Sequence, residues 1–247
     1  SFTLEKLTSH ISVCKELRMK RTVALLGALL ATCAMASGAT ITQTEAFSGV
    51  PDFQSTLTFD SFDTSLGTLD SVEIIADLLI TGGQAQVDNE SPSTATVSVE
   101  FGADADLMSA GEVFMPAVNA VASVTQNLLL DPDDGDGASI DPSPTDGATI
   151  PIVSTTGFDS ALMVRANGGI EALQVSTFED TSAGLDYMIM LDSGTVFSIS
   201  GASGVAGGFT PASVAGDVTV VYTYTVPEPM TMSLLALGGV ALLRRRK

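Results

Sequence analysis

The sequence predicts an all-β protein, an antiparallel β-sandwich of jelly-roll type, and three observations lead to this prediction. Most of the chain consists of short segments in which apolar and polar residues alternate, as in a strand with one buried face. Clusters of Gly, Pro and Asp separate these segments, as turns between strands require. No soluble segment shows a convincing helical pattern. We therefore expect roughly ten short strands in residues 40–226.

The first half of this region contains four expected strands. The clearest has apolar residues at every second position, while Glu73 and Asp77 occupy the other parity. The pair Gly82 and Gly83 follows it and is expected to end the strand, because glycine tolerates the backbone angles of a turn. The expected strands are Thr40–Phe47, Phe53–Asp60, Ser71–Thr81 and Thr94–Phe101.

The second half contains the remaining expected strands. In the last of them, Val218, Val220 and Tyr222 alternate with polar or smaller residues, which indicates one buried face. The run Met188–Met190 is interpreted as core strand and not as a binding surface. The expected strands are Ser123–Leu130, Thr149–Val153, Ile170–Phe178, Leu185–Leu191, Thr195–Ile199 and Asp217–Val226.

The N-terminal residues have the pattern of an export signal. Residues 1–18 carry no periodic pattern, and we interpret them as an extension upstream of a translation start at Met19. Residues 19–39 combine a basic start, an apolar run and small residues, which predicts a signal helix that a signal peptidase removes. The small residues place the cleavage after Ala36 or Ala39, so the mature chain is expected to begin at Ser37 or Thr40.

The C-terminal residues 227–247 have three parts in a defined order. Prolines in Pro227-Glu228-Pro229 end the preceding strand, because proline has no N–H and a fixed φ. The apolar run Met230–Leu243 is expected to form a short transmembrane helix, since lipid offers no partners to an open backbone. The basic end is expected to stay on the cytoplasmic side. It consists of Arg244, Arg245, Arg246 and Lys247.

This tail resembles the PEP-CTERM sorting signal of exported proteins in Gram-negative, biofilm-forming bacteria. The resemblance implies that an exosortase, a membrane-embedded transpeptidase-like protease, cuts near the Pro-Glu-Pro motif after transient anchoring in the inner membrane. The protein would then reach the cell surface or the extracellular matrix. The alternative is an ordinary membrane anchor. The run Met230–Leu243 is short for that role, because a helix needs about 20 apolar residues to span a bilayer.

The charge of the chain is concentrated in the region between the two ends. The whole chain has a net charge of −19, but residues 40–226 hold 26 acidic residues and one basic residue, a net charge of −25. Such a domain is repelled by nucleic acid and by anionic lipid, so neither is an expected partner. Divalent cations, neutral glycans, including exopolysaccharide, and cationic surfaces are the partners that this charge allows. The plain alternative is that the acidic residues keep an exported domain hydrated.

The residues that are absent exclude several reactions. The single histidine is His10, and the cysteines are Cys14 and Cys33, so all three lie before the mature domain. A lipoprotein modified at Cys33 is a weaker alternative to the signal peptide, because Thr32 precedes it where a smaller residue is expected. Without His, Cys or Lys, the domain lacks serine or cysteine triads, zinc sites and Schiff-base chemistry. We expect no enzymatic activity and no cofactor.

Pairs of carboxylates are the catalytic groups that the domain still offers. They would permit a secreted glycan-active enzyme, since glycosidases work with two Asp or Glu residues. A carbohydrate-binding module is a further alternative. Both are disfavoured because the chain has no Trp and only Tyr187, Tyr222 and Tyr224, whereas sugar sites usually present aromatic platforms.

A second resemblance lies within the β region. The segment Phe62–Leu69 follows one expected strand and leads into the next, and Asp88–Ser91 follows a later one. These residues are similar to the choice-of-anchor E domain, a bacterial exported β module joined to interchangeable surface anchors. The resemblance implies no catalytic residues. Independently of it, Asp63 is expected to hydrogen-bond its own backbone in a turn, and Arg165 to form a structural ion pair.

An acidic run in residues 131–137, with Asp141 and Asp146 downstream, is the candidate metal site. Closely spaced carboxylates repel each other, and a hard cation with oxygen ligands would relieve the repulsion. The run resembles calcium loops imperfectly, because Pro132 stands where a first ligand is needed and Ser143 where a final Glu is needed. Weak calcium binding is one interpretation and a hydrated loop between strands is the other. The candidate ligands are Asp131, Asp133, Asp134 and Asp136.

Overall fold

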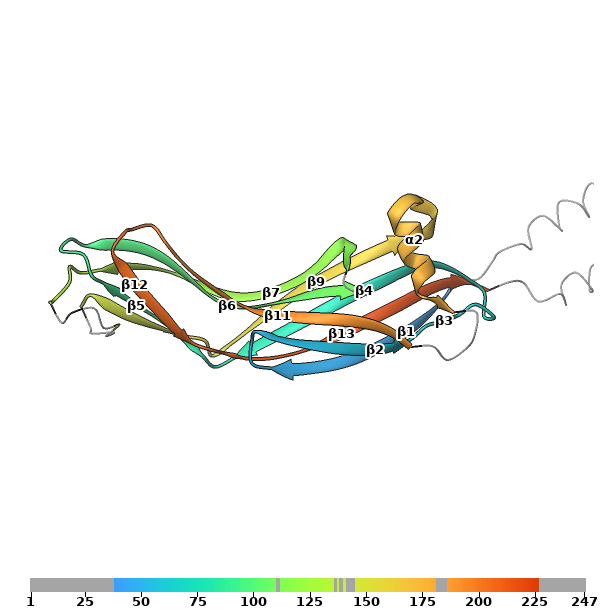
Figure 1. Ribbon diagram of the computed structural model, residues 1–247, viewed down its shortest axis with the longest axis horizontal. Coiled ribbons are helices and arrows are strands. Elements are labelled where there is room, and N and C mark those ends of the chain that lie inside the picture. The colour runs from blue at the N-terminus through green and yellow to red at the C-terminus, as the bar shows by residue number, and fades with distance from the viewer. Residues whose placement is uncertain are drawn as a thin grey trace, which may run out of the picture. The chain divides into compact units, whose positions relative to one another are not determined.

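The computed structural model describes residues 38–109, 112–135, 137, 140, 145–180 and 186–226, apart from a few side chains within them. The chain divides into two units, one formed by both ends and one spanning Ala39–Tyr224. The second unit is the β domain. Two four-stranded sheets make up most of it (Figure 1).

The first sheet has the order β1-β13-β4-β9 and the second has the order β2-β11-β6-β7. Numbered along the chain, these eight strands pair first with last, second with seventh, third with sixth and fourth with fifth. That pairing is the one obtained by wrapping a long hairpin into two sheets, the jelly roll. The bounds are β1 Gly38–Gly49, β2 Phe53–Asp60, β4 Thr68–Thr81, β6 Ala95–Ser109, β7 Glu112–Leu130, β9 Ser154–Val164, β11 Asp186–Ser200 and β13 Ser213–Thr225.

The connections between the eight strands carry smaller elements at the two ends of the sandwich (Figure 1). At one end, β5, β8 and β12 form a three-stranded sheet. At the other end lie a short parallel pair, β3 and β10, and the helices η1 and α2. The bounds are β3 Phe62–Asp63, β5 Gln84–Asn89, β8 Gly147–Pro151, η1 Arg165–Asn167, α2 Gly169–Thr177, β10 Glu179–Asp180 and β12 Val205–Thr210.

The core follows from the alternation in the sequence. In β4, Val72, Ile74 and Ile80 are fully buried, and Asp77 on the other parity is exposed. The two positive-φ glycines at 82 and 83 end this strand as predicted, with φ of 67° and 74°. Apolar burial therefore holds the β domain together, at about 25 cal/mol for each Å² removed from water.

Aromatic residues form a dense part of the core beneath α2. Phe178 stacks on Tyr187 with ring centroids 3.9 Å apart, and Phe62 contacts Tyr222 edge-on. The hydroxyl of Tyr222 donates to the carbonyl of Asp60 at 3.1 Å. Burial, with smaller contributions from Tyr187 and Asp60, raises the pKa of Tyr222 far above its usual range. The rings are Phe62, Phe114, Phe178, Tyr187, Tyr222 and Tyr224, which we call the aromatic cluster.

The prediction of a strand at Ile170–Phe178 is wrong, because this segment is the helix α2. Gly168 precedes the helix and Gly169 is its first residue, and both have positive φ. Glu171 in the first turn accepts hydrogen bonds from the backbone of Val164 and the side chain of Asn167. An acid at this position stabilises a helix N-terminus, and this local bonding outweighs the β-branched residues of the segment.

Other strand predictions are correct in place but not in extent. The segments 185–191 and 195–199 belong to one strand, β11, because Asp104 bonds Ser193 and Gly194 and carries the strand through the expected turn. Within it Ile189 is fully buried, whereas Met188 is 59% exposed, so only part of the methionine run is core. The strands β3, β5, β9, β10 and β12 were not predicted. In β9, apolar residues occupy both faces, which hides the alternation.

Candidate functional site

The sorting and export residues lie almost entirely outside the described residues. This holds for the sorting motif Pro227, Glu228 and Pro229, for the basic end and for Ala36. Ala39 lies in β1, so cleavage after Ala36 would leave that strand whole, and cleavage after Ala39 would remove its first two residues. Within the described part of the chain, no helix is both long and apolar enough to cross a membrane.

The acidic run lies in the connection between β7 and β8, where three connections of the jelly roll meet. Backbone hydrogen bonds tie this connection to the one that follows β5. The N–H of Asn89 donates to the carbonyl of Asp146 at 3.1 Å, and that of Asp133 donates to the carbonyl of Ser91 at 2.9 Å. The side chain of Asn89 donates to the carbonyl of Asp131 at 2.6 Å. Asn89, which is 1% exposed, therefore links the connection after β5 to both Asp131 and Asp146.

Three carboxylates converge here, and we call them the Asp146 cluster. Asp133, Asp134 and Asp146 each place an oxygen within 4.8 Å of the other two. Asp146 is 1% exposed, whereas its two partners are exposed. One oxygen of Asp146 accepts the N–H of Asp134 at 2.9 Å, and one oxygen of Asp133 accepts that of Gly135 at 2.9 Å.

The structure therefore revises the set of candidate ligands taken from the sequence. Asp133 and Asp134 lie together, as expected for neighbours in a loop. Asp131 joins the site through its backbone, and Asp136 lies outside the described residues. Asp146 was not among the predicted ligands. It reaches the others because β8 pairs with β5 and places the residue before β8 opposite Asn89, which spacing along the chain does not reveal.

A second group of carboxylates crosses the outer face of β6 and β11. Asp106 faces Asp192 across the two strands, and Asp104 lies two residues away. Partial burial and then the charge of Asp104 raise the pKa of Asp106, with Asp192 adding a smaller effect. A hydrogen bond from Asn119 acts in the opposite direction. These groups remain in contact with water, so solvent screens their repulsion.

The opposite end contains the only basic residue of the domain. Arg165 forms an ion pair with Glu179 at 2.6 Å, and its Nε donates to the carbonyl of Leu69 at 2.7 Å. The predicted structural ion pair is thus confirmed. The predicted turn at Asp63 is also confirmed, because the N–H of Ser65 donates to its carboxylate at 2.8 Å. Hydrogen bonds from the Ser65 hydroxyl and backbone lower the pKa of Asp63.

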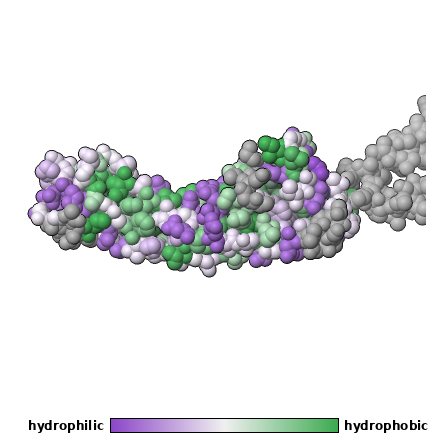
Figure 2. All heavy atoms as spheres, viewed as in Figure 1, coloured by the Kyte–Doolittle hydropathy of each residue, from purple (hydrophilic) through white to green (hydrophobic). Residues whose placement is uncertain are grey.

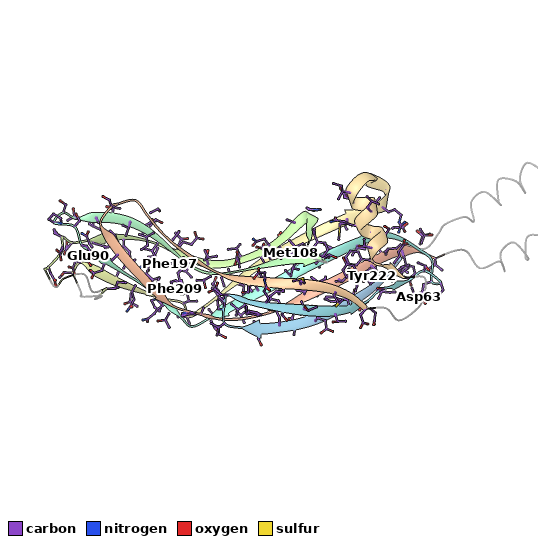
Figure 3. The ribbon with its side chains drawn as sticks, viewed as in Figure 1. Asp63, Glu90, Met108, Phe197, Phe209 and Tyr222 are labelled. Atoms are coloured by element: carbon purple, nitrogen blue, oxygen red, sulfur yellow. The ribbon has the colours of Figure 1, made fainter. Side chains whose placement is uncertain are left out.

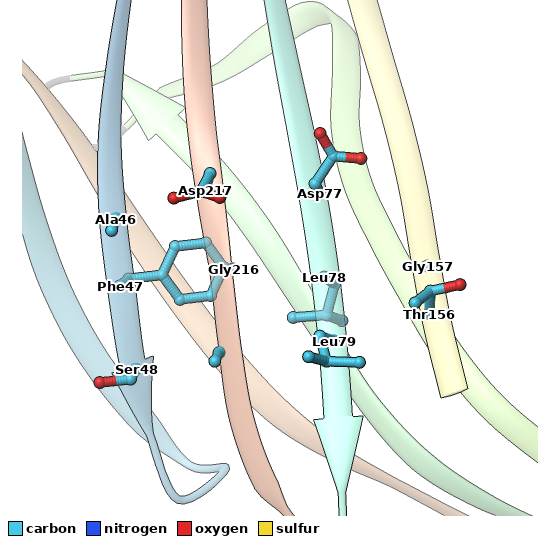
Figure 4. A pocket seen from close by; sticks show the side chains of 11 residues that line it. Ala46, Phe47, Ser48, Asp77, Leu78, Leu79, Thr156, Gly157, Gly216 and Asp217 are labelled. Carbon is cyan, nitrogen blue, oxygen red and sulfur yellow. The ribbon is translucent and has the colours of Figure 1, made fainter. Parts of the chain in front are cut away.

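A shallow pocket of about 490 Å³ crosses the first sheet (Figure 4). Phe47, Leu78 and Gly216 form its apolar part, and Asp77 and Asp217 provide two carboxylates. Gly216 is required here, because a Cβ would lie 2.1 Å from the carbonyl of Asp77 and against the Phe47 ring. The pocket contains no histidine, cysteine or lysine, so among the described residues its chemistry is limited to those carboxylates.

The surface is mixed in polarity. On the face shown in Figure 2, hydrophilic and hydrophobic residues are interspersed. Figure 3 places Glu90, Phe197 and Phe209 at the end of the three-stranded sheet, and Asp63 and Tyr222 at the opposite end. Phe158 and Phe209 are the exposed aromatic side chains among the described residues, at 63% and 42% exposure.

Residues 225–247 match the model of the PEP-CTERM protein-sorting motif. The match confirms the resemblance of the tail and indicates an exported protein that an exosortase processes and that is sorted to the cell surface. It covers only the C-terminal end. The resemblance of the β region to the choice-of-anchor E domain stays a prediction. No curated protein matches the chain.

Several solved structures resemble the chain weakly. A tailspike protein of Acinetobacter baumannii phage AM24 is 16% identical over 77% of this chain and 27% of its own, with a TM-score of 0.17. The T13 viral particle of IBDV gives 13% identity, 83% and 47% coverage and a TM-score of 0.15. Mud Crab Dicistrovirus gives 8% identity, 79% and 75% coverage and a TM-score of 0.14. The chain spans less than half of the first two, and such scores carry no functional argument.

Proposed function

We propose that the chain is a non-enzymatic β-sandwich protein of the cell surface or extracellular matrix. A signal peptide in residues 19–39 would start its export, and the tail would anchor it transiently in the inner membrane until an exosortase cuts near Pro227-Glu228-Pro229. The observation that carries the proposal is the sorting motif at residues 225–247. The mature part would act through its surface, in the manner of a choice-of-anchor domain.

The charge and residue content of the domain support this role. A net charge of −25 in residues 40–226 favours hydration outside the cell. These residues contain no cysteine, so the domain has no disulfide of its own. The absence of histidine, cysteine and lysine there removes the usual nucleophile and base pairs. Neutral exopolysaccharide is a matrix partner that this charge does not repel.

Mass spectrometry of the protein released by the producing cells tests the proposal. We expect a mature species that begins at Ser37 or Thr40 and ends near Glu228, because both ends are removed during export. Deleting residues 244–247 should reduce retention in the membrane before processing, since the basic stop is lost. A control with Glu45→Gln should be processed normally. Recovery of matrix-associated protein with residues 230–247 intact would replace sorting by permanent anchoring.

A glycan-active enzyme is the second candidate function, and one observation favours it. The pocket on the first sheet contains both Asp77 and Asp217, and glycosidases act through carboxylate pairs. Turnover of a panel of polysaccharides, with Asp77→Asn and Asp217→Asn as inactive controls, would establish it. Binding to insoluble glycan without turnover, lost in Phe158→Ala, would instead favour a carbohydrate-binding module.

A further inference from the structure

We propose that the Asp146 cluster binds one calcium ion, which links the connection after β7 to the strand β8. The ligands would be carboxylate oxygens of Asp133, Asp134 and Asp146. This site differs from the contiguous run suggested by the sequence, because its central ligand is a buried residue twelve positions beyond Asp134. The proposal is independent of the export route, since it concerns the β domain alone.

The spacing of the three carboxylates fits calcium. Calcium–oxygen distances are about 2.3–2.6 Å, so two oxygens on one calcium can be separated by at most roughly 4.6–5.2 Å. The oxygens of the Asp146 cluster lie within 4.8 Å of one another. Magnesium, with oxygen distances of about 2.0–2.1 Å, requires a tighter set in near-ideal octahedral geometry. The spacing of the cluster is therefore compatible with calcium.

The state of Asp146 is a second and independent observation. Its side chain is 1% exposed, and its Oδ2 accepts the N–H of Asp134. Its Oδ1 is also buried, and it accepts no hydrogen bond from the described residues. A buried carboxylate oxygen without a partner is costly unless an ion or a water molecule satisfies it. A calcium ion at the cluster would supply that partner and the missing positive charge.

The chain supplies no cation of its own at this end. Arg165 is the only basic residue in residues 40–226, and it is held by Glu179 and the carbonyl of Leu69 at the opposite end of the sandwich. The Asp146 cluster therefore has no basic side chain of the described domain beside it. A positive charge for the cluster must come from solution.

Hydrogen bonds hold the backbone around the cluster. Asp131 donates its N–H to the carbonyl of Thr145 at 3.1 Å, and Asp133 donates to that of Ser91 at 2.9 Å. These bonds hold both ends of the connection next to β5, so binding needs little further ordering. Exposed ligands and water would complete the coordination. We expect a dissociation constant of about 0.1–1 mM, as in extracellular calcium modules.

Thermal unfolding and calorimetry of the purified full-length chain test the proposal. At tenfold excess of calcium over the dissociation constant, one site should raise the Tm by about 3–6 °C. The titration should show one ion per chain and a weaker response to magnesium at equal ionic strength. The variants are Asp146→Asn, Asp133→Asn and Asp134→Asn, with Glu45→Gln as the matched loss of one exposed charge in β1.

The variants separate a site from general screening. Asp146→Asn should abolish the calcium response, Asp133→Asn and Asp134→Asn should weaken it at least tenfold, and Glu45→Gln should leave it unchanged. The two exposed variants keep the test valid if the buried one does not fold. Equal shifts in wild type and in all variants would overturn the proposal in favour of diffuse screening. Absence of both heat and Tm shift in wild type would overturn it in favour of a buried water.

Discussion

The two ends of the jelly roll differ in what lies beside their carboxylates. Beneath α2, Glu179 is paired with Arg165, and the aromatic cluster packs beside it. At the end of the three-stranded sheet, Asp146 is 1% exposed and lies with two further carboxylates and no basic side chain. Both ends are formed by connections between the same eight strands. At one end the chain itself supplies the cation, whereas at the other we propose that calcium from solution does so.

The ends also differ in the forces that hold their connections. Stacked rings and apolar burial dominate beneath α2, and such contacts do not depend on salt or metal. Backbone hydrogen bonds from Asn89, Asp131 and Asp133 dominate at the acidic end, and each contributes only about 1 kcal/mol. Phe178→Ala and Arg165→Met test this difference, in addition to the calcium titration, and Asp106→Asn tests the separate group of carboxylates on β6 and β11.

The largest effect is expected from Phe178→Ala in the aromatic cluster. Phe178 is fully buried and contacts Phe114, Tyr187 and Tyr222, so its removal leaves a cavity. The free energy of unfolding should fall by about 3–5 kcal/mol in a urea titration. Phe158→Ala, at a ring that is 63% exposed, should cost less than about 1 kcal/mol. A similar loss in both variants would contradict the view that apolar burial holds this end of the fold together.

A smaller loss is expected from Arg165→Met. The substitution leaves Glu179 without its cation and the carbonyl of Leu69 without its donor. The two charged side chains are 34% and 21% exposed, so solvent screens the pair and the cost should be about 1–2 kcal/mol. The double variant Arg165→Met, Glu179→Gln should lose less than the two single losses together. Additive losses would show that the pair has no coupling.

The smallest effect is expected from Asp106→Asn, and it depends on pH. The pKa of Asp106 is raised above 3.8 in the fold, so the folded state binds its proton more tightly than the unfolded state. The ionised group therefore lowers stability as pH rises through that range. At pH 7 the free energy of unfolding of Asp106→Asn should exceed that of wild type by a few tenths of a kcal/mol. The difference is small because solvent screens the charge of Asp106.

The pH profile of Asp106→Asn supplies its own control. The advantage over wild type should disappear below about pH 3.8, where Asp106 is protonated in both states. Its calcium response at pH 7 should equal that of wild type, since this group of carboxylates lies on β6 and β11 and shares no residue with the Asp146 cluster. Loss of the calcium response in this variant would place the ion at Asp106 instead of at the Asp146 cluster.

Local patterns were enough to predict much of this protein. The alternation in Ser71–Thr81 and Asp217–Val226 predicts β4 and β13, because each strand buries one face. The turn at Asp63 and the ion pair of Arg165 were predictable, since the first involves neighbouring residues and the second uses the only cation of the domain. The sorting tail is a linear signal, so its order of residues identifies it.

Tertiary structure decided the features that depend on residues far apart in the chain. The segment Ile170–Phe178 is an exception, because its helix goes with local features, Glu171 and the glycines at its start, where alternation alone favoured a strand. β11 continues through Gly194 because Asp104 lies on the neighbouring strand. Asp146 enters the acidic site only through the pairing of β8 with β5. Alternation reports which face of a strand is buried, but the positions of its neighbours are set by packing across the whole sandwich.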